Sequence, residues 1–339
     1  MKFSADVLRI DTDETIRSIT ESIRHAVHSI LHRKGAVVAV SGGIDSSVCA
    51  ALCAKALGKD SVVVLLLPER DSSPDALHLG RALADVLGIS AVVEDIAPIL
   101  EHAGCYRRQL EAIRMVFPDY SEGWKNKITI PSILEGDRLN VSRLTIQTPD
   151  GQQRSERLPL KPYLQLVAAT NFKQRTRTML AYYHADRMNY AVCGTPNRLE
   201  YDQGFFVKGG DGLADFKPIA HLYKTQVYAI ARSLGVPEEI CRRAPTTDTF
   251  SLAQTQEEFF FALPYDKMDL CLYALNHNVP AADIAPAVGL SVEQVERVFK
   301  DIGAKRRGTL PLHMAPVLAQ TVPEIHRLVT EVFKPGEYR

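Results

Sequence analysis

Apolar residues follow two different spacings along the first third of the chain. Residues 13–32 carry them at the spacing of an amphipathic helix, at Ile16, Ile19, Ile23 and Val27 among others. Three short stretches are instead continuously apolar and rich in β-branched side chains, the pattern of strands buried in a parallel sheet. These predicted strands are residues 36–40, 61–67 and 89–94.

A second helix is predicted between the last two of these strands. Ser73 and Pro74 match the cap and first-turn positions of a helix, which we expect to end near Gly88. Strand, helix, strand, helix and strand in succession imply right-handed crossover connections. The fold class is therefore α/β, a doubly wound parallel sheet flanked by helices, with ligands at the carboxyl ends of the strands.

Residues 104–161 break this alternation, and we interpret them as an insertion. Residues 139–148 alternate apolar and polar side chains and run into Pro149-Asp150-Gly151, a strong turn signal. Weaker alternation continues over 154–160, so the insertion contains a predicted β-hairpin.

The α/β pattern resumes after the insertion with a long helix over 163–187 and a short strand over 190–193. A loop rich in glycine and aspartate covers 202–217, and the chain after 222 has helical character. We therefore expect one domain over 1–339, with the insertion at 104–161 and a helical C-terminal region at 250–339.

Composition and charge narrow the class of protein. The 339 residues include 40 basic and 40 acidic side chains, which argues against a nucleic-acid partner or a membrane surface. No apolar stretch reaches bilayer length, and the first residues lack the apolar core of a signal peptide. The six cysteines are scattered without a CxxC pair, so neither disulfides nor zinc is indicated. A cytoplasmic enzyme is expected.

The segment SGGIDSS at 41–47 carries the clearest chemical signal. It follows the first predicted strand and precedes a helix-forming run at 48–57. A strand that turns through glycines into a helix points several backbone N–H groups, and the positive end of the helix dipole, at one spot. Such a pocket suits phosphate. It lacks the lysine of a Walker A loop and the spacing of a dinucleotide fingerprint.

This segment resembles the SGGxDS loop of the ATP pyrophosphatases, which activate a carboxylate or carbonyl as an adenylate and release pyrophosphate. The resemblance implies that the loop binds ATP and holds the leaving pyrophosphate, with Asp45 as a Mg²⁺ ligand. The implied ATP-binding residues here are Ser41, Gly42, Gly43, Asp45, Ser46 and Ser47.

Four further segments, in the same order and at compatible spacing, resemble motifs of the NAD synthase family. They are NFKQRTR at 171–177, GTPNRLE at 194–200, the glycine-rich run at 204–218, and APTTD at 244–248. Two arginines at i, i+2 on a helix are suited to bind phosphate or carboxylate. Glycine density lets a backbone approach a ligand closely.

The resemblance to NAD synthases implies a role for each matching residue. Glu200 is the second Mg²⁺ ligand beside Asp45, and Asp45 and Lys208 are the catalytic candidates. The remaining implied ATP contacts are Thr195, Lys224 and Thr246, and the implied substrate contacts are Arg175, Lys208, Asp215 and Lys305.

Lys305 to Arg307 resemble the basic end of a C-terminal motif of the family and end a helix predicted over about 291–303. The chain departs from this motif in two ways, since Ala304 replaces its histidine and the proline spacing is altered at Leu310-Pro311. Basic residues at a helix end are also favoured by the helix dipole. The resemblance covers residues 13–100 and 163–310, and leaves the insertion at 104–161 outside.

The implied reaction is ATP-dependent amidation of deamido-NAD to NAD through an acyl-adenylate, with release of AMP and pyrophosphate. Ammonia is the nitrogen donor, free or from a separate glutaminase chain, and the family implies a homodimer. Three alternatives stay open: the same chemistry on another carboxylate, sulfur transfer to tRNA, and a non-catalytic binding protein. The balanced charge and the absence of a catalytic cysteine pair disfavour the second. The two candidate Mg²⁺ acids disfavour the third.

Overall fold

A four-stranded parallel sheet forms the centre of the computed structural model, which describes residues 3–132, 142–247 and 249–325. The strand order is β3-β2-β1-β7, and the register places Ala36 opposite Val62 on one side and Ala191 on the other. The predicted strands are confirmed. They are β1 (Ala36–Ala39), β2 (Val62–Leu66), β3 (Ser90–Val93) and β7 (Ala191–Cys193).

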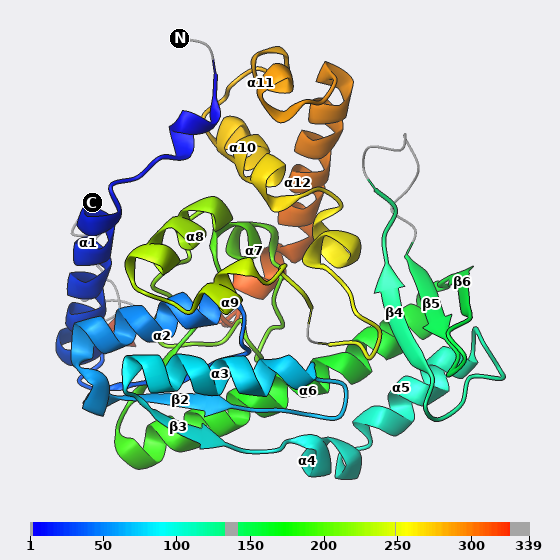
Figure 1. Ribbon diagram of the computed structural model, residues 1–339, viewed down its shortest axis with the longest axis horizontal. Helices are drawn as coiled ribbons and strands as arrows, with labels where there is room; N and C mark the ends of the chain where they lie inside the picture. The colour runs from blue at the N-terminus through cyan, green and yellow to red at the C-terminus, as the bar shows by residue number, and fades with distance from the viewer. Residues whose placement is uncertain (1–2, 133–141, 248, 326–339) are drawn as a thin grey trace.

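Helices cover both faces of this sheet (Figure 1). Val38 and Val64 point into a core shared with α1, α2, α3 and α8, while Val37 and Leu65 point into a second core with α4, α5 and α6. All six cysteines are buried and unpaired. The helices are α1 (Thr12–Arg24), continued by a π-helical segment (His25–Ile30), α2 (Ile44–Leu57), α3 (Pro74–Leu87), α4 (Ala97–His102), α5 (Cys105–Arg114), α6 (Leu160–Met188) and α8 (Lys224–Ser233).

Successive strands are added on opposite sides of β1, so the direction of strand addition reverses between β1 and β7. From β1 the chain first adds β2 and β3 on one side, and it later adds β7 on the other side. In doubly wound sheets, ligands bind at the carboxyl ends of the strands beside such a switch point. The predicted doubly wound α/β class is confirmed.

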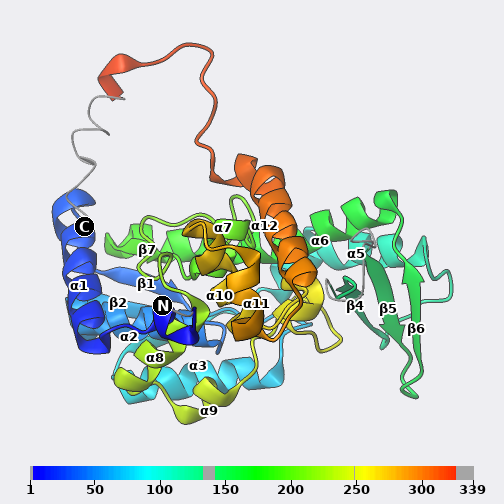
Figure 2. The same ribbon diagram turned by 90° about the horizontal axis from the view of Figure 1, so that it is seen from above.

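The insertion forms a separate three-stranded antiparallel sheet of order β4-β5-β6 at one end of α6 (Figures 1 and 2). The predicted hairpin is β5 (Arg143–Gln147) and β6 (Gln153–Arg157), and residues 139–141 of that prediction lie outside the described residues. Strand β4 (Lys125–Thr129) was not predicted from the sequence. It pairs with β5, with Lys125 opposite Gln147 at one end and Thr129 opposite Arg143 at the other.

Helices dominate the C-terminal part, as predicted. The helix expected to end near 303 continues to His313, so the prediction that Lys305 to Arg307 close a helix was wrong. Residues 314–325 leave the body at the end of this helix (Figure 2), and 326–339 lie outside the described residues. Among the described residues, no helix is long and apolar enough to cross a bilayer. The remaining helices are α7 (Arg198–Gln203), α9 (Glu238–Arg242), α10 (Tyr265–Asn276), α11 (Ala281–Val288) and α12 (Val292–His313).

Candidate active site

The SGGIDSS segment forms a tight loop between β1 and the start of α2. Gly42 has φ +73°, and a Cβ there would lie 2.9 Å from the carbonyl oxygen of Ala76, so the turn requires glycine. Gly43 caps α2. The Ser46 hydroxyl accepts from the Ser41 N–H at 3.3 Å and donates to the Gly43 carbonyl at 3.1 Å. The helix N-terminus therefore opens onto the carboxyl edge of the sheet, where its dipole favours an anion.

Asn197 joins the two carboxylates that were predicted to bind Mg²⁺. Its side-chain amide donates to Asp45 Oδ1 at 3.0 Å, and its backbone N–H donates to Glu200 Oε2 at 3.1 Å. Asn197 also caps α7, because its side-chain oxygen accepts from the N–H groups of Leu199 and Glu200. Both acids thus face one cavity from two different elements, α2 and α7.

Lys224 completes this group from the first turn of α8. Its buried ammonium forms an ion pair with Asp45. Burial alone would lower the pKa of Lys224, but the carboxylates of Asp45 and Glu200 outweigh it and raise the pKa. Asp269 of α10 fixes the start of α8, since it accepts from the backbone N–H of Lys224 at 3.1 Å and of Thr225 at 2.8 Å.

Glu200 is buried in this group at a high electrostatic cost. Burial, with the nearby Asp45 carboxylate, raises the pKa of Glu200 to about 8, although Lys224 partly offsets the effect. Its Oε1 accepts from Gln256 Nε2 at 2.9 Å. Buried acids with strongly raised pKa values beside a second acid are found at functional sites and also in structural ion-pair networks.

A cavity of about 630 Å³ lies over these groups. Ten of the residues singled out from the sequence line it: Ser41, Gly43, Asp45, Ser46, Thr195, Glu200, Lys224, Thr246, Arg175 and Lys208. Gly42 and Ser47 do not line it. Gly42 shapes the turn, and the Ser47 hydroxyl donates to the Gly43 carbonyl at 2.8 Å.

The candidate substrate residues lie where α6, the glycine-rich run and α12 meet. Arg175 Nε donates to the Lys208 carbonyl at 3.3 Å, and Lys208 Nζ donates to the Pro311 carbonyl at 2.8 Å. At Gly204 a Cβ would lie 2.3 Å from the Cβ of Thr309, so α12 packs directly against the backbone beside the cavity. The end of α12 is therefore part of the cavity wall.

Asp215 and Lys305 lie outside the cavity lining. Asp215 accepts from the Val192 N–H at 2.7 Å and from the Tyr182 hydroxyl at 3.2 Å, so it ties β7 to α6. Lys305 donates to the Phe260 carbonyl at 2.7 Å and pairs with Asp301. Burial lowers the pKa of Lys305. In this structure Asp215 and Lys305 make contacts within the protein, and the substrate contacts assigned to them stay predictions.

Sequence analysis assigned no role to two residues of the site. Asn197 stands inside the GTPNRLE segment, where its position just before a helix is a capping signal that could have identified it. Gln256 had no such signal, because it reaches Glu200 only through the tertiary fold.

The donor set fits a divalent cation held partly by substrate. Among the described residues, no group of three or more His, Cys, Asp or Glu side chains could hold a metal by itself. Asp45 and Glu200 offer two carboxylates from separate elements, and Mg²⁺ commonly takes one or two carboxylates, waters and phosphate oxygens.

The sheet, the glycine loop and the paired acids are those of an α/β enzyme with a candidate anion-binding site at the switch point of its sheet. The family to which this enzyme belongs follows from its similarity to known proteins. The NAD synthase family model matches residues 15–115 and 136–307. The chain belongs to the NAD synthase family and is a ligase.

Relatives match nearly the whole chain. An NH(3)-dependent NAD(+) synthetase of Mesorhizobium japonicum is 57% identical over 94% of this chain and 100% of its own length. One of Thermotoga neapolitana is 36% identical over 87% of this chain and 94% of its own. The solved NH3-dependent NAD synthetase of Campylobacter jejuni shares the fold, with a TM-score of 0.59 and 22% identity over 92% of this chain and all of its own.

The family match extends further than the motifs suggested. It includes residues 104–115 and 136–161, which sequence analysis had placed outside the resemblance. Within the matched span only 116–135 is left out, a stretch that contains β4. The resemblance to the family therefore covers more of the chain than the motifs indicated, and the bounds of the insertion stay a prediction.

Proposed function

We propose that this protein amidates deamido-NAD to NAD with ATP and ammonia, through an acyl-adenylate. The observation that carries the proposal is the joint placement of Asp45 and Glu200 by Asn197, at the N-terminus of α2 and inside one cavity. The relatives are NH(3)-dependent NAD(+) synthetases, and this supports ammonia as the nitrogen donor without a glutaminase subunit.

The first half of the reaction transfers an adenylyl group. A nicotinate carboxylate oxygen attacks the α-phosphorus of ATP, and the bond from that phosphorus to the pyrophosphate oxygen breaks. The departing pyrophosphate carries new negative charge. Backbone N–H groups of the 41–47 loop, the α2 dipole and the Lys224 ammonium lie where they would stabilise that charge.

The second half forms the amide. The lone pair of ammonia attacks the acyl carbon, the bond to the AMP oxygen breaks, and one proton is released. No covalent enzyme intermediate is needed. Positioning of the substrate carboxylate is assigned to Lys208 and Arg175, which line the same cavity.

Asp45 and Glu200 are the residues that would hold Mg²⁺. The cation would supply charge neutralisation on the phosphate oxygens. In the free protein Lys224 is paired with Asp45, so we expect this ammonium to shift toward phosphate when the nucleotide binds.

The test measures AMP, pyrophosphate and NAD formed from deamido-NAD, with ammonium in one series and glutamine in another. We expect NAD with ammonium and at most trace product with glutamine. Asp45→Ala is expected to lose pyrophosphate release almost entirely. Unchanged release by that variant would refute the assignment of Asp45.

A different carboxylate acceptor remains the second candidate, because Ala304 replaces the family's histidine. AMP formation that requires ammonium but proceeds with another acid, and not with deamido-NAD, would favour it. The proposed homodimer is tested separately, by the mass of the protein in solution.

A further inference from the structure

One loop of the cavity, described at residues 244–247 and 249–256, folds back on itself. Thr246 pairs with Thr255 in an antiparallel bridge, and the Gln256 N–H donates to the Pro245 carbonyl at 3.1 Å. Asp248 lies outside the described residues. The loop thus has a base near 245–247 and 254–256, and a tip that includes 249–253.

The base of this loop reaches the candidate active site. Thr246, Thr247 and Gln256 line the cavity. Gln256 also holds Glu200 through the 2.9 Å hydrogen bond to its Oε1. Any movement of the base would therefore displace a candidate nucleotide contact and one of the two candidate Mg²⁺ ligands.

The aromatic side chain at the tip of the loop packs against the insertion rather than in the core of the central sheet. Phe250 is 4% exposed and belongs to an apolar cluster built mainly by the insertion and the start of α6. Phe117, Ile128, Leu144 and Leu166 are members of the same cluster. A buried aromatic side chain of this kind commonly anchors the segment that carries it.

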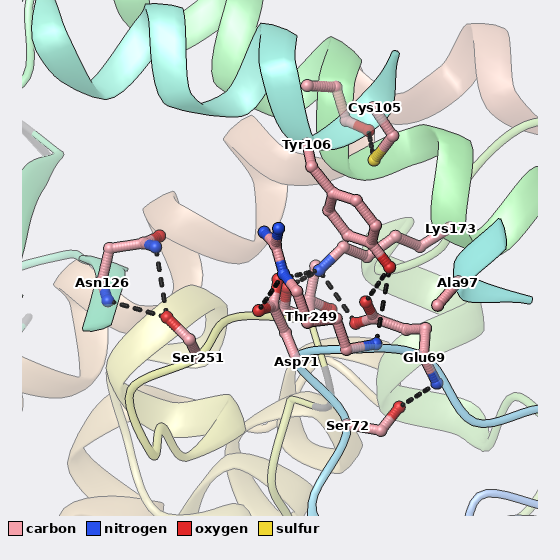
Figure 3. Close-up of polar contacts among 12 residues, drawn as sticks. Glu69, Asp71, Ser72, Ala97, Cys105, Tyr106, Asn126, Lys173, Thr249 and Ser251 are labelled. Atoms are coloured by element: carbon pink, nitrogen blue, oxygen red, sulfur yellow. Dashed lines mark hydrogen bonds and ion pairs between the residues drawn. The ribbon is translucent and has the colours of Figure 1, made fainter. Parts of the chain in front are cut away.

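Strand β4 adds polar contacts to the same tip. Asn126 is buried, and both its backbone N–H and its side-chain amide donate to Ser251 Oγ, at 3.0 Å and 3.2 Å (Figure 3). The Leu252 N–H donates back to the Asn126 carbonyl at 3.0 Å. The tip therefore runs beside β4 and bonds to its backbone.

Lys173 of α6 holds the other side of the tip. Its fully buried ammonium donates to the Thr249 carbonyl at 2.9 Å and pairs with Glu69 at 2.9 Å and Asp71 at 2.7 Å (Figure 3). Glu69 also accepts from the Tyr106 hydroxyl at 2.9 Å. The Lys173 ammonium thus connects the loop tip to the segment after β2. That segment lines the cavity at Pro68 and Ser72.

We propose that the insertion and Lys173 are positioning elements that hold the 244–256 loop in its cavity-lining conformation before any ligand binds. Only the expected effect on the KM for ATP rests on the proposed function. The anchoring contacts are made by Phe250, Ser251 and Thr249. The cavity residues whose positions depend on these contacts are Thr246 and Gln256. Because the anchored loop is ordered in advance, nucleotide binding does not have to supply the free energy of ordering it.

Phe250→Leu tests the anchor, and Phe117→Leu is the matched control in the same cluster. Both lose a similar apolar volume from the insertion core, but only the first changes the loop. For Phe250→Leu we expect the Leu252 and Gln256 amides to exchange hydrogen about tenfold faster in the free protein. We expect KM for ATP to rise with little change in kcat, and Phe117→Leu to show neither effect.

Ser251→Ala is the second variant, because it removes only the hydroxyl that accepts from Asn126 and keeps the core intact. We expect a smaller change in the same direction. Unchanged exchange and KM in both loop variants, or an equal change in Phe117→Leu, would overturn the proposal. The exchange measurement needs no substrate, so it decides the inference even if the wild-type protein makes no NAD.

Discussion

Asn197 donates its side-chain amide to Asp45 across 3.0 Å, and this bond joins the first turn of α2 to the start of α7. The same residue caps α7 and donates its backbone N–H to Glu200. One fully buried side chain therefore fixes the relative positions of two acids that lie 155 positions apart in the sequence, 45 and 200. Its cap and its contact with Asp45 can be separated by mutation.

Asn197→Ser keeps an oxygen that can cap α7 but removes the amide that donates to Asp45. We expect KM for Mg·ATP to rise about tenfold, because Asp45 loses a partner that orients it. Asn197→Ala removes the cap as well, and should cost about 1 kcal/mol more in the free energy of unfolding. Steady-state kinetics and denaturant unfolding measure the two effects. Equal KM values for Asn197→Ser and the wild type would show that the amide does not orient Asp45.

Glu200→Gln keeps the shape of the side chain and removes its charge. We expect turnover to fall by at least about 100-fold, because one candidate cation ligand is lost. We also expect at most a small loss of thermal stability in the free protein, because removal of a charge that burial disfavours offsets the hydrogen bond that one side-chain oxygen no longer accepts. Melting curves and AMP formation give both readouts. A variant that is much less stable but retains activity would contradict this reading of Glu200.

Asp269 gives a prediction for the pH dependence of stability. Burial raises its pKa to about 6, although the N–H groups of Thr225 and Lys224 partly offset the effect. The folded protein therefore holds this proton more tightly than the unfolded chain, whose pKa is about 3.9. The contribution of Asp269 to stability is full below about pH 4 and is lost as the pH rises to about 6.

Asp269→Asn removes this titration. As the pH rises from 4 to 7, we expect the wild type to lose on the order of 2–3 kcal/mol of unfolding free energy relative to the variant. Denaturant titrations of both proteins across that range measure the difference. A constant offset between the two curves would show that Asp269 does not titrate in this interval.

Gly204→Ala tests the docking of α12, with Gly209→Ala as its control. Both glycines have positive φ, +73° and +72°, so both variants carry similar backbone strain. Only at Gly204 would the new Cβ meet Thr309, while nothing lies within 4 Å at Gly209. We expect Gly204→Ala to be less stable than the control by about 1–3 kcal/mol. Thermal unfolding of the two variants tests this, and equal losses would argue against close packing of α12.

The strands, the first helices and the glycine loop could be predicted because their signals are local. Apolar runs, Ser73-Pro74 and the SGGIDSS segment each specify their own backbone. Four candidate residues of the SGGIDSS segment, Ser41, Gly43, Asp45 and Ser46, line the cavity, as expected for the carboxyl end of a parallel strand. The other six candidate residues that line it were named from the family resemblance and not from local patterns.

Elements that depend on distant partners could not be predicted in this way. The strand β4 has the sequence KNKIT, which is a poor strand former. It forms because it pairs with β5 and bonds to the Ser251 hydroxyl and the Leu252 N–H. The length of α12 was underestimated because Gly303 and the basic triplet resemble a helix end. In the structure Arg306 pairs with Asp202 and Thr309 packs on Gly204, and these contacts outweigh the local signal.

The burial of all six cysteines has a practical consequence. Native protein should resist maleimide reagents, because each of its own cysteine side chains is buried. A single cysteine introduced at Val317, which is 84% exposed beyond the end of α12, would then carry one fluorophore per polypeptide. Such a probe would report how residues 314–325 move relative to the body, without any background labelling to subtract.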